Sequence, residues 1–201
     1  MIQGSDEWKA ARLGKVTASR MADLMAKTKT GYGAGRANLM AKLITEKLTG
    51  VSDDNYTNAA MSWGIEHEAE ARAAYIFHCD MPVCEVGFID HPYVPDSGAS
   101  PDGTVGDDGL VEIKCPQSAT HIDTLLSKAV PDKYVKQMLW QMACTGRKWC
   151  DFVSYDPRMP ANLSFFVKRV EFGAQVVKEM EAEVVAFLAE MNTKIEQLRA
   201  L

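Results

Sequence analysis

Apolar residues recur every three or four positions along much of the chain, which is the spacing of helices with one buried face. This pattern predicts a short helix over residues 5–14, ending at Gly14, and a second over residues 17–27, capped by Thr17 or Ser19. Longer helices are predicted over residues 37–49, residues 62–78, residues 131–146 and a long C-terminal segment. The glycine-rich residues 28–36 and the polar residues 52–58 are predicted to be loops, the first of them mobile.

A second part of the chain has the alternation of strands. Strands are predicted over residues 83–90, 97–103, 110–116, 149–156 and 163–172. Asp108-Gly109 is a strong hairpin-turn signal before the third of them. The order of helices, three strands, helix, two strands and helix predicts one mixed α/β domain over residues 1–201.

The strand over residues 110–115 carries charges where a buried strand should not. Alternation places Glu112 and Lys114 on one face with Leu110, while the opposite face is apolar throughout. Asp102 ends the preceding strand and can point to the same place. A solvated sheet surface and a built polar site are both compatible with this pattern.

Two helices present further polar groups. In the helix over residues 62–78, Glu68 falls in the arc of Ile65, Tyr75 and Ile76, where a lone carboxylate is costly unless it is paired or binds a metal. The helix over residues 131–146 has a polar stripe, formed by Lys133, Tyr134, Gln137 and Gln141. Such a stripe is either the wet face of the helix or the lining of a site.

Composition narrows the class of protein. The chain has 201 residues, of which 47% are hydrophobic and 24% charged, as in an ordinary soluble domain. Its apolar runs are too short for a membrane helix and its start lacks the apolar segment of a signal peptide, so no membrane association is expected. Five cysteines, none in a CxxC pair, favour free thiols in a reducing cytoplasm.

The charge is unevenly distributed. The net charge is −5, but residues 1–50 hold nine Lys and Arg against four Asp and Glu, and residues 51–100 hold one against nine. If this division persists in space, one surface suits phosphates and one region is dense in carboxylates; the two sets of charges can also mix in the fold.

Converging carboxylates without Cys or His ligands suit a hard cation, Mg²⁺ or Mn²⁺. A lysine beside them cannot be a ligand, but it can activate a water or neutralise an oxyanion. The His residues form no HExxH pattern and the chain has no GxxxxGK[ST] loop, which disfavours zinc hydrolysis and nucleotide-driven chemistry. The residues therefore favour hydrolysis of a phosphate ester.

Asp102, followed ten residues later by Glu112-Ile113-Lys114, resembles the PD-(D/E)xK nuclease signature. The surrounding stretches "EWKAARLGKVTAS", "SWGIEHE", "GASPDG", "LVEIKCP" and "SYDPRM" occur in the order of the phage lambda exonuclease family, also called YqaJ-type viral recombinases. The resemblance covers roughly residues 5–160 and extends to prophage-encoded alkaline exonucleases.

The resemblance implies a restriction-endonuclease-like core with flanking helices. It also implies a Mg²⁺-dependent enzyme, with Mn²⁺ able to substitute, that degrades one strand of linear duplex DNA from its 5′ end and releases 5′-mononucleotides. The family members are ring-shaped homotrimers in the cytoplasm of a bacterial host. They leave a 3′ single-stranded tail, which a single-strand annealing protein takes over.

The family roles transfer to particular residues. Asp102, Glu112, the carbonyl of Ile113 and Glu68 would hold metal ions. Lys114 would activate the attacking water, and Gln137 would orient the water or the scissile phosphate.

The resemblance also implies DNA contacts. The 5′-phosphate would bind at Arg12, Ser19, Ser100 and Thr17. Met61 would wedge open the terminal base pair, and the duplex backbone would be gripped by Lys27, Lys29 and Arg36.

The sequence departs from the family pattern in places. A further acid upstream of Asp102 could be Asp90 or Asp96, and a basic phosphate contact expected after Lys114 falls near Thr120 or His121. Two alternatives stay open: a restriction-like endonuclease on the same core, and a catalytically inactive module that binds DNA ends.

Overall fold

The computed structural model describes residues 1–29, 31–52 and 59–201. Most of the predicted 52–58 loop lies outside these residues. The helices are α1 (Asp6–Arg12), the 3₁₀ turn η1 (Ala18–Arg20), α2 (Met21–Met25), α3 (Ala34–Thr49), α4 (Ala59–Cys79), α5 (Ser118–Ser127), α6 (Asp132–Thr145) and α7 (Ala174–Arg199). The strands are β1 (Val16–Thr17), β2 (Lys27–Thr28), β3 (Gly31–Tyr32), β4 (Val83–Cys84), β5 (Ile89–Asp90), β6 (Ser97–Ala99), β7 (Gly103–Val105), β8 (Gly109–Lys114), β9 (Trp149–Tyr155) and β10 (Phe165–Glu171).

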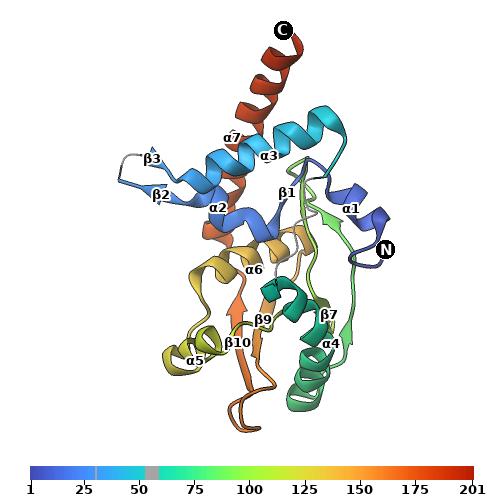
Figure 1. Cartoon of the computed structure of the whole chain (residues 1–201), viewed down its shortest axis with the longest axis vertical. Coiled ribbons are helices and arrows are strands. Elements are labelled where there is room, and N and C mark those ends of the chain that lie inside the picture. Colours follow the sequence, from blue (N-terminus) through green and yellow to red (C-terminus); the bar gives the residue numbers. More distant parts are fainter. Residues whose placement is uncertain (30, 53–58) are drawn as a thin grey trace.

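The central sheet has the strand order β10-β9-β8-β7-β4 within the described residues. The neighbours β8 and β9 run parallel, with Glu112 opposite Phe152, and the other pairs are antiparallel. A parallel pair needs a long crossover, and α5 and α6 supply it between β8 and β9 (Figure 1). The predicted mixed α/β class is therefore confirmed.

Both faces of the central sheet are covered. On one face, Leu110 and Phe152 pack with buried residues of α2, α6 and α7 in the larger core. On the other face, Val111 and Ile113 pack against Ala71 and Tyr75 of α4 in a smaller core. β8 is consequently covered on both sides: Glu112 is buried, and Lys114 at the end of the strand is partly exposed.

A smaller sheet, of order β1-β6-β5, joins the N-terminal region to the strands before the Asp102 turn. The chain enters β1 through a turn at Gly14, whose φ of +66° suits glycine. Its amide donates to Glu46 Oε2 of α3 at 2.9 Å. This contact fixes the N-terminal segment against α3 beside the central sheet.

Four predictions about elements are corrected. The strand predicted over residues 97–103 divides, because residues 97–99 form β6 of the smaller sheet and Gly103 begins β7 of the central sheet. The helix predicted over residues 17–27 is a strand, a 3₁₀ turn and a short helix, because Thr17 pairs with Gly98 in β6 instead of capping a helix. The strand predicted over residues 83–90 divides into β4 and β5, which pair with different partners, β7 and β6. The loop predicted over residues 28–36 contains the hairpin β2–β3 and the start of α3, and Lys27 and Tyr32 of this hairpin both bond Glu183 of α7.

The other predicted elements are present with small shifts at their ends. α5 was not predicted, because its residues were left as a connection between the strand and the helix beginning after Pro131. The C-terminal helix α7 runs past α3, and its end projects from the body of the molecule (Figure 1). None of the described helices is long and apolar enough to span a bilayer. The five cysteines, all within the described ranges, are free thiols.

Candidate active site

Asp102 lies in the turn between β6 and β7, and its side chain contacts β8. The Asp102 Oδ2 atom accepts a hydrogen bond from the Ile113 amide at 2.6 Å. Burial, followed by the charge of Glu112, raises the pKa of Asp102 to about 8. A carboxylate with such a pKa gains a proton readily near neutral pH unless a cation stabilises its charge, which is a property expected of a metal ligand.

Glu112 is the most constrained carboxylate of the site. Its side chain is 0% exposed and accepts three charged or polar donors. Gln137 Nε2 donates to Oε1 at 2.7 Å, and Gln141 Nε2 donates to Oε2 at 2.5 Å. The Lys114 ammonium forms an ion pair with Oε1. These donors offset the large cost of burying a charge.

Lys114 carries its proton in this setting. Burial disfavours its charged form, but the carboxylates of Glu112 and Asp102 outweigh burial and raise the pKa of Lys114 above its ordinary value. The side chain keeps some exposure and lies over the Tyr134 ring, 5.5 Å from its centroid. Lys114 is therefore a fixed cation at the edge of the site.

Glu68 approaches the same place from α4 but has its own partner. Its charge contributes to the raised pKa of Asp102, so the two carboxylates are near each other. Its Oε1 atom, however, forms an ion pair with Arg72 Nη2 at 2.6 Å. Within the part of the chain that the structure describes, no three His, Cys, Asp or Glu side chains lie close enough together to hold one ion.

The surroundings of Glu68 differ from the predicted ones. α4 packs on the sheet through Ala71 and Tyr75, which are fully buried, whereas Ile65 and Ile76 are exposed. The predicted inward arc was wrong for these two isoleucines, because Ile65 borders an open cleft instead of the core. Glu68 borders the same cleft and is partly exposed.

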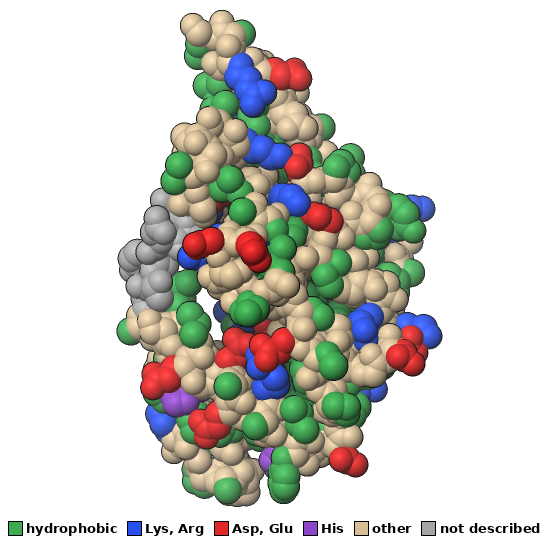
Figure 2. Space-filling view, turned by 90° about the vertical axis from the view of Figure 1, so that its right-hand side faces the viewer, with side chains coloured by type: hydrophobic (Ala, Val, Ile, Leu, Met, Phe, Trp, Pro, Cys, Tyr) green, Lys and Arg blue, Asp and Glu red, His purple; other side chains and the backbone are tan. Residues whose placement is uncertain are grey.

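The cleft brings together four of the eight residues predicted to contact DNA. It has a volume of about 880 Å³, and its lining includes Arg12, Thr17, Ser19, Met61 and Glu68. The face over α1 and α4 is visibly hollowed, and Asp and Glu side chains border the hollow (Figure 2). Residues from α1, η1 and α4, far apart in the sequence, thus face one space.

The predicted phosphate ligands are held in place by their neighbours. Ser100 Oγ accepts a hydrogen bond from Trp8 Nε1 at 2.9 Å and from Arg12 Nη1 at 3.4 Å. The Arg12 guanidinium also lies over the Trp8 ring, 4.0 Å from its centroid. The Thr17 and Ser19 hydroxyls lie 3.2 Å apart. Trp8, which sequence reasoning did not single out, is therefore the residue that orients Arg12.

The predicted duplex-gripping residues are not part of this cleft. Lys29 is exposed, and Lys27 forms an ion pair with Glu183 at 2.7 Å. Arg36 is buried, contacts the Tyr32 and Phe187 rings and lies 3.6 Å from Glu190. The prediction for Arg36 is corrected, because its guanidinium is a packing group between α3 and α7.

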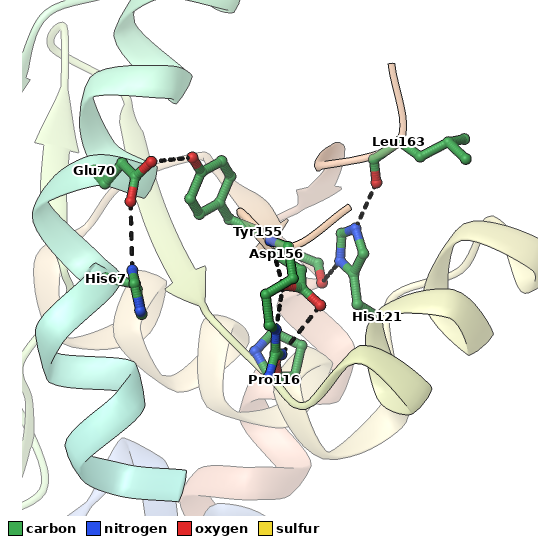
Figure 3. A network of polar contacts seen from close by, with 9 residues as sticks. His67, Glu70, Pro116, His121, Tyr155, Asp156 and Leu163 are labelled. Atoms are coloured by element: carbon green, nitrogen blue, oxygen red, sulfur yellow. Dashed lines mark hydrogen bonds and ion pairs between the residues drawn. The ribbon is translucent and has the colours of Figure 1, made fainter. Parts of the chain in front are cut away.

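Other polar candidates contact groups outside the candidate metal site. Asp90 forms an ion pair with Lys15 at 2.6 Å and Asp96 one with Lys47 at 2.7 Å, so both are engaged elsewhere. His121 is fully buried and cannot be the expected phosphate contact. Because the Leu163 carbonyl can only accept, His121 Nε2 donates to it at 2.8 Å, and Nδ1 accepts from the Ser154 hydroxyl at 2.7 Å (Figure 3).

Besides Trp8, sequence reasoning missed the site roles of Gln141 and Arg72. Gln141 belonged to the polar stripe of the helix over residues 131–146, and the structure shows that the two glutamines of this stripe contact Glu112. Arg72 gave no signal beyond being the one basic residue between positions 51 and 100.

The arrangement of the mixed sheet and its flanking helices matches the folds of solved exonuclease structures. A phage-related exonuclease from Haemophilus somnus 129PT shares the fold, with a TM-score of 0.71 and 14% identity over 92% of this chain and 95% of the other.

The family itself follows from two further comparisons. The chain belongs to the YqaJ-like viral recombinase domain family, whose model matches residues 7–148. It is also similar to LHK-Exo, an alkaline exonuclease from Laribacter hongkongensis, with 52% identity, a TM-score of 0.92 and coverage of 98% of this chain and 97% of the other. The structure of LHK-Exo in complex with dAMP matches with the same identity and coverage and a TM-score of 0.93. A comparison with curated protein sequences finds no match.

Proposed function

We propose that the protein is a Mg²⁺-dependent deoxyribonuclease that digests one strand of linear duplex DNA from the 5′ end and leaves a 3′ single-stranded tail. Family membership and the 52% identity to an alkaline exonuclease support nuclease chemistry. The observation that carries the proposal is Glu112, a fully buried carboxylate held by two amides and a lysine beside Asp102.

The residues present fit a hard divalent cation. Asp102, Glu112 and the Ile113 carbonyl offer oxygen donors, and Mg²⁺ needs few protein ligands because it retains several waters. Glu68 would bind or orient a second divalent ion from the cleft side. Bound Mg²⁺ supplies Lewis-acid activation of a phosphoryl oxygen.

The chain's own groups then position the reaction. Lys114 is protonated and fixed by Glu112, so it supplies positive charge where the phosphate gains negative charge during attack by water. Gln137 uses one amide hydrogen on Glu112, which leaves its second hydrogen to orient the water or a phosphate oxygen. The site thereby needs no histidine base.

The cleft accounts for the proposed polarity. Arg12 presents a guanidinium, already oriented by Trp8 and Ser100, to the space that Ser19 and Thr17 also line. A guanidinium with hydroxyl donors suits a terminal phosphate with two negative charges. Met61 is 50% exposed and lines the same cleft, and in this proposal it would separate the first base pair. Lys29 remains a candidate contact to the duplex backbone.

The proposed assembly is a homotrimeric ring around DNA in the cytoplasm of a bacterial host. A ring explains how a chain of net charge −5 stays on a polyanion, because enclosure replaces bulk attraction. The single-stranded product would pass to an annealing protein.

The test compares linear duplexes that carry 5′-phosphate or 5′-hydroxyl ends, with and without Mg²⁺, against a covalently closed circle. Release of 5′-mononucleotides is expected from the phosphorylated linear duplex with Mg²⁺, and the circle should stay intact. Asp102→Ala should abolish digestion, whereas Asp107→Ala, an exposed acid of the same hairpin, should not. Cutting of the circle would support the endonuclease instead, and full activity of Asp102→Ala would remove the proposed site.

A further inference from the structure

Arg72 lies between two carboxylates at the border of the cleft. Its Nη2 atom is 2.6 Å from Glu68 Oε1, and its Nη1 atom is 2.8 Å from Glu85 Oε1. The three side chains line the same cleft as Arg12 and Ser19. The guanidinium thus has an inner partner, next to the candidate metal site, and an outer partner toward solvent.

The inner ion pair is more than a surface contact. The Arg72 side chain is 16% exposed, whereas Glu85 is 68% exposed. Solvent screens the pair with Glu85 strongly, but it screens the pair with Glu68 less. Arg72 Nε is buried and has no hydrogen-bond partner within the described residues, so the guanidinium keeps a donor that its two carboxylates do not use.

Glu68 cannot serve Arg72 and a cation equally well. Its carboxylate is near Asp102, yet it does not complete a three-residue ligand cluster among the described residues while Oε1 contacts Arg72. A divalent ion that binds Glu68 would also repel the guanidinium at this distance. Arg72 and the ion therefore compete for one carboxylate.

A phosphate in the cleft changes this competition. Guanidinium groups bind phosphate oxygens through two parallel hydrogen bonds, and Arg72 faces the space in which the DNA end is proposed to lie. A phosphate that takes up Arg72 would release Glu68 toward the metal.

We propose that Arg72 is a positioning residue that holds Glu68 back from the metal site until a DNA phosphate enters the cleft and binds the guanidinium. This inference rests on the proposed function. It makes occupancy of the second metal ion depend on DNA, and by reciprocity the second ion strengthens DNA binding by the same factor. An enzyme built in this way is completed for hydrolysis only when its substrate is in place.

Binding of Mn²⁺ to the full-length protein without DNA is the first test, followed through the electron paramagnetic resonance signal of free Mn²⁺. Two Mn²⁺ ions are expected to bind, the second of them more weakly and through Glu68. Arg72→Gln should lower the dissociation constant of this more weakly bound Mn²⁺ about fivefold, because the competing guanidinium is gone. Glu85→Gln should leave that affinity unchanged or weaken it, because the guanidinium then pairs with Glu68 alone. A general loosening of the cleft would move both variants in the same direction, and that result, or no gain in Arg72→Gln, overturns the inference.

A double variant shows whether the gain acts through Glu68. In the Glu68→Gln background, Arg72→Gln should no longer lower the dissociation constant of the more weakly bound Mn²⁺. A gain of the same size in that background would show a nonspecific effect of charge and would contradict the inference.

The DNA-dependent step is tested with a 5′-phosphorylated duplex whose terminal linkages resist hydrolysis. In the wild-type protein this duplex should lower the dissociation constant of the more weakly bound Mn²⁺. In Arg72→Gln the ratio of the dissociation constants without and with the duplex should fall to about one. Arg72→Lys, which keeps the charge but cannot bridge two groups, should retain an intermediate effect. Equal coupling in wild type and Arg72→Gln would refute the role of Arg72. If Asp102→Ala also kept full Mg²⁺-dependent activity, the proposed function would fail; if only the coupling result failed, the proposed function would stand.

Discussion

At the scale of single residues, the site is organised around one buried charge. Glu112 has no contact with solvent, and its two oxygens are divided between Lys114 with Gln137 on one side and Gln141 on the other. The Gln141 amide is itself oriented by Cys150, whose Sγ lies 4.0 Å from Oε1. These contacts on both oxygens restrict the movement of the carboxylate.

Replacement of Gln141 by methionine, which has a similar volume, should weaken both the fold and the reaction. Glu112 Oε2 would lose its 2.5 Å donor while it stays buried, at a cost of about 1–3 kcal/mol. We expect a corresponding loss in the free energy of unfolding by urea and a fall in kcat of about tenfold or more. Met142→Leu, a neighbouring buried site on α6, is the matched control. Wild-type stability and turnover in Gln141→Met would show that the second amide has no role.

At the scale of elements, what the sequence revealed depended on the range of the interactions involved. Local signals were sufficient for α3, α6 and α7, whose bounds follow capping glycines and periodic apolar residues. Pairing between distant segments was not visible locally, and this is why the strand at Thr17 and the division between β4 and β5 were missed. Burial of a polar group on a partner element was equally hidden.

The candidate site shows the same division. Asp102, Glu112 and Lys114 were found because they lie on one hairpin, where spacing determines which groups meet. The hydrogen bond from Gln141 to Glu112 was missed because it depends on how α6 lies against β8. The ion pair of Glu68 with Arg72 was also missed: the spacing of four residues allowed it, but only the depth of α4 in the cleft gives it weight.

The corner at which β9 ends also joins several elements. Arg158 donates to Asp156 from Nε at 2.7 Å and to the Pro116 carbonyl at 3.2 Å, while Tyr155 donates to Glu70 of α4 at 2.7 Å (Figure 3). The Arg158 guanidinium lies 4.2 Å from the centroid of the Trp63 ring. This corner therefore links β9 and the end of β8 to the helix that carries Glu68.

Asp156 makes the stability of this corner depend on pH. Burial opposes its charge, but hydrogen bonds from Arg158 and Ser118 outweigh burial and lower the pKa of Asp156 to about 2. Because the folded-state pKa is below the unfolded value of about 3.9, the stabilisation is present above pH 4 and is lost as the pH falls toward 2. Asp156→Asn should therefore lower the free energy of unfolding at pH 7 by roughly 1–2 kcal/mol.

The measurement is urea unfolding of wild type and Asp156→Asn across pH 7 to 3. The difference between the two proteins should narrow as the pH falls below 4. Asp107→Asn, which changes an exposed acid, should track the wild type at every pH. A difference that stays constant with pH would mean that the ionised form of Asp156 is not the source of the stabilisation.

At the scale of the whole molecule, acidic charge and attachment to DNA must be reconciled. The net charge of −5 disfavours binding to a polyanion, and the basic groups of the cleft are partly neutralised by Glu46, Glu68 and Glu85. Direct attraction would be weak and would fall steeply with salt. A closed ring removes this difficulty, since a strand that passes through it leaves only at its end.

The proposed ring predicts that processivity and affinity respond differently to salt. In solution the protein should have three times the 22.2 kDa mass of one chain, measured by light scattering during size-exclusion chromatography. On a long end-labelled duplex, with excess unlabelled DNA added after digestion begins, the run length should change little between 50 and about 200 mM salt, while the rate of initiation falls severalfold because end capture is electrostatic. A protein that grips DNA by charge alone would lose run length and initiation together. A stable monomer, or run lengths that fall in parallel with initiation, would contradict enclosure. Digestion at Asp102 and Glu112 would then be distributive, with the protein leaving the DNA between cleavage events.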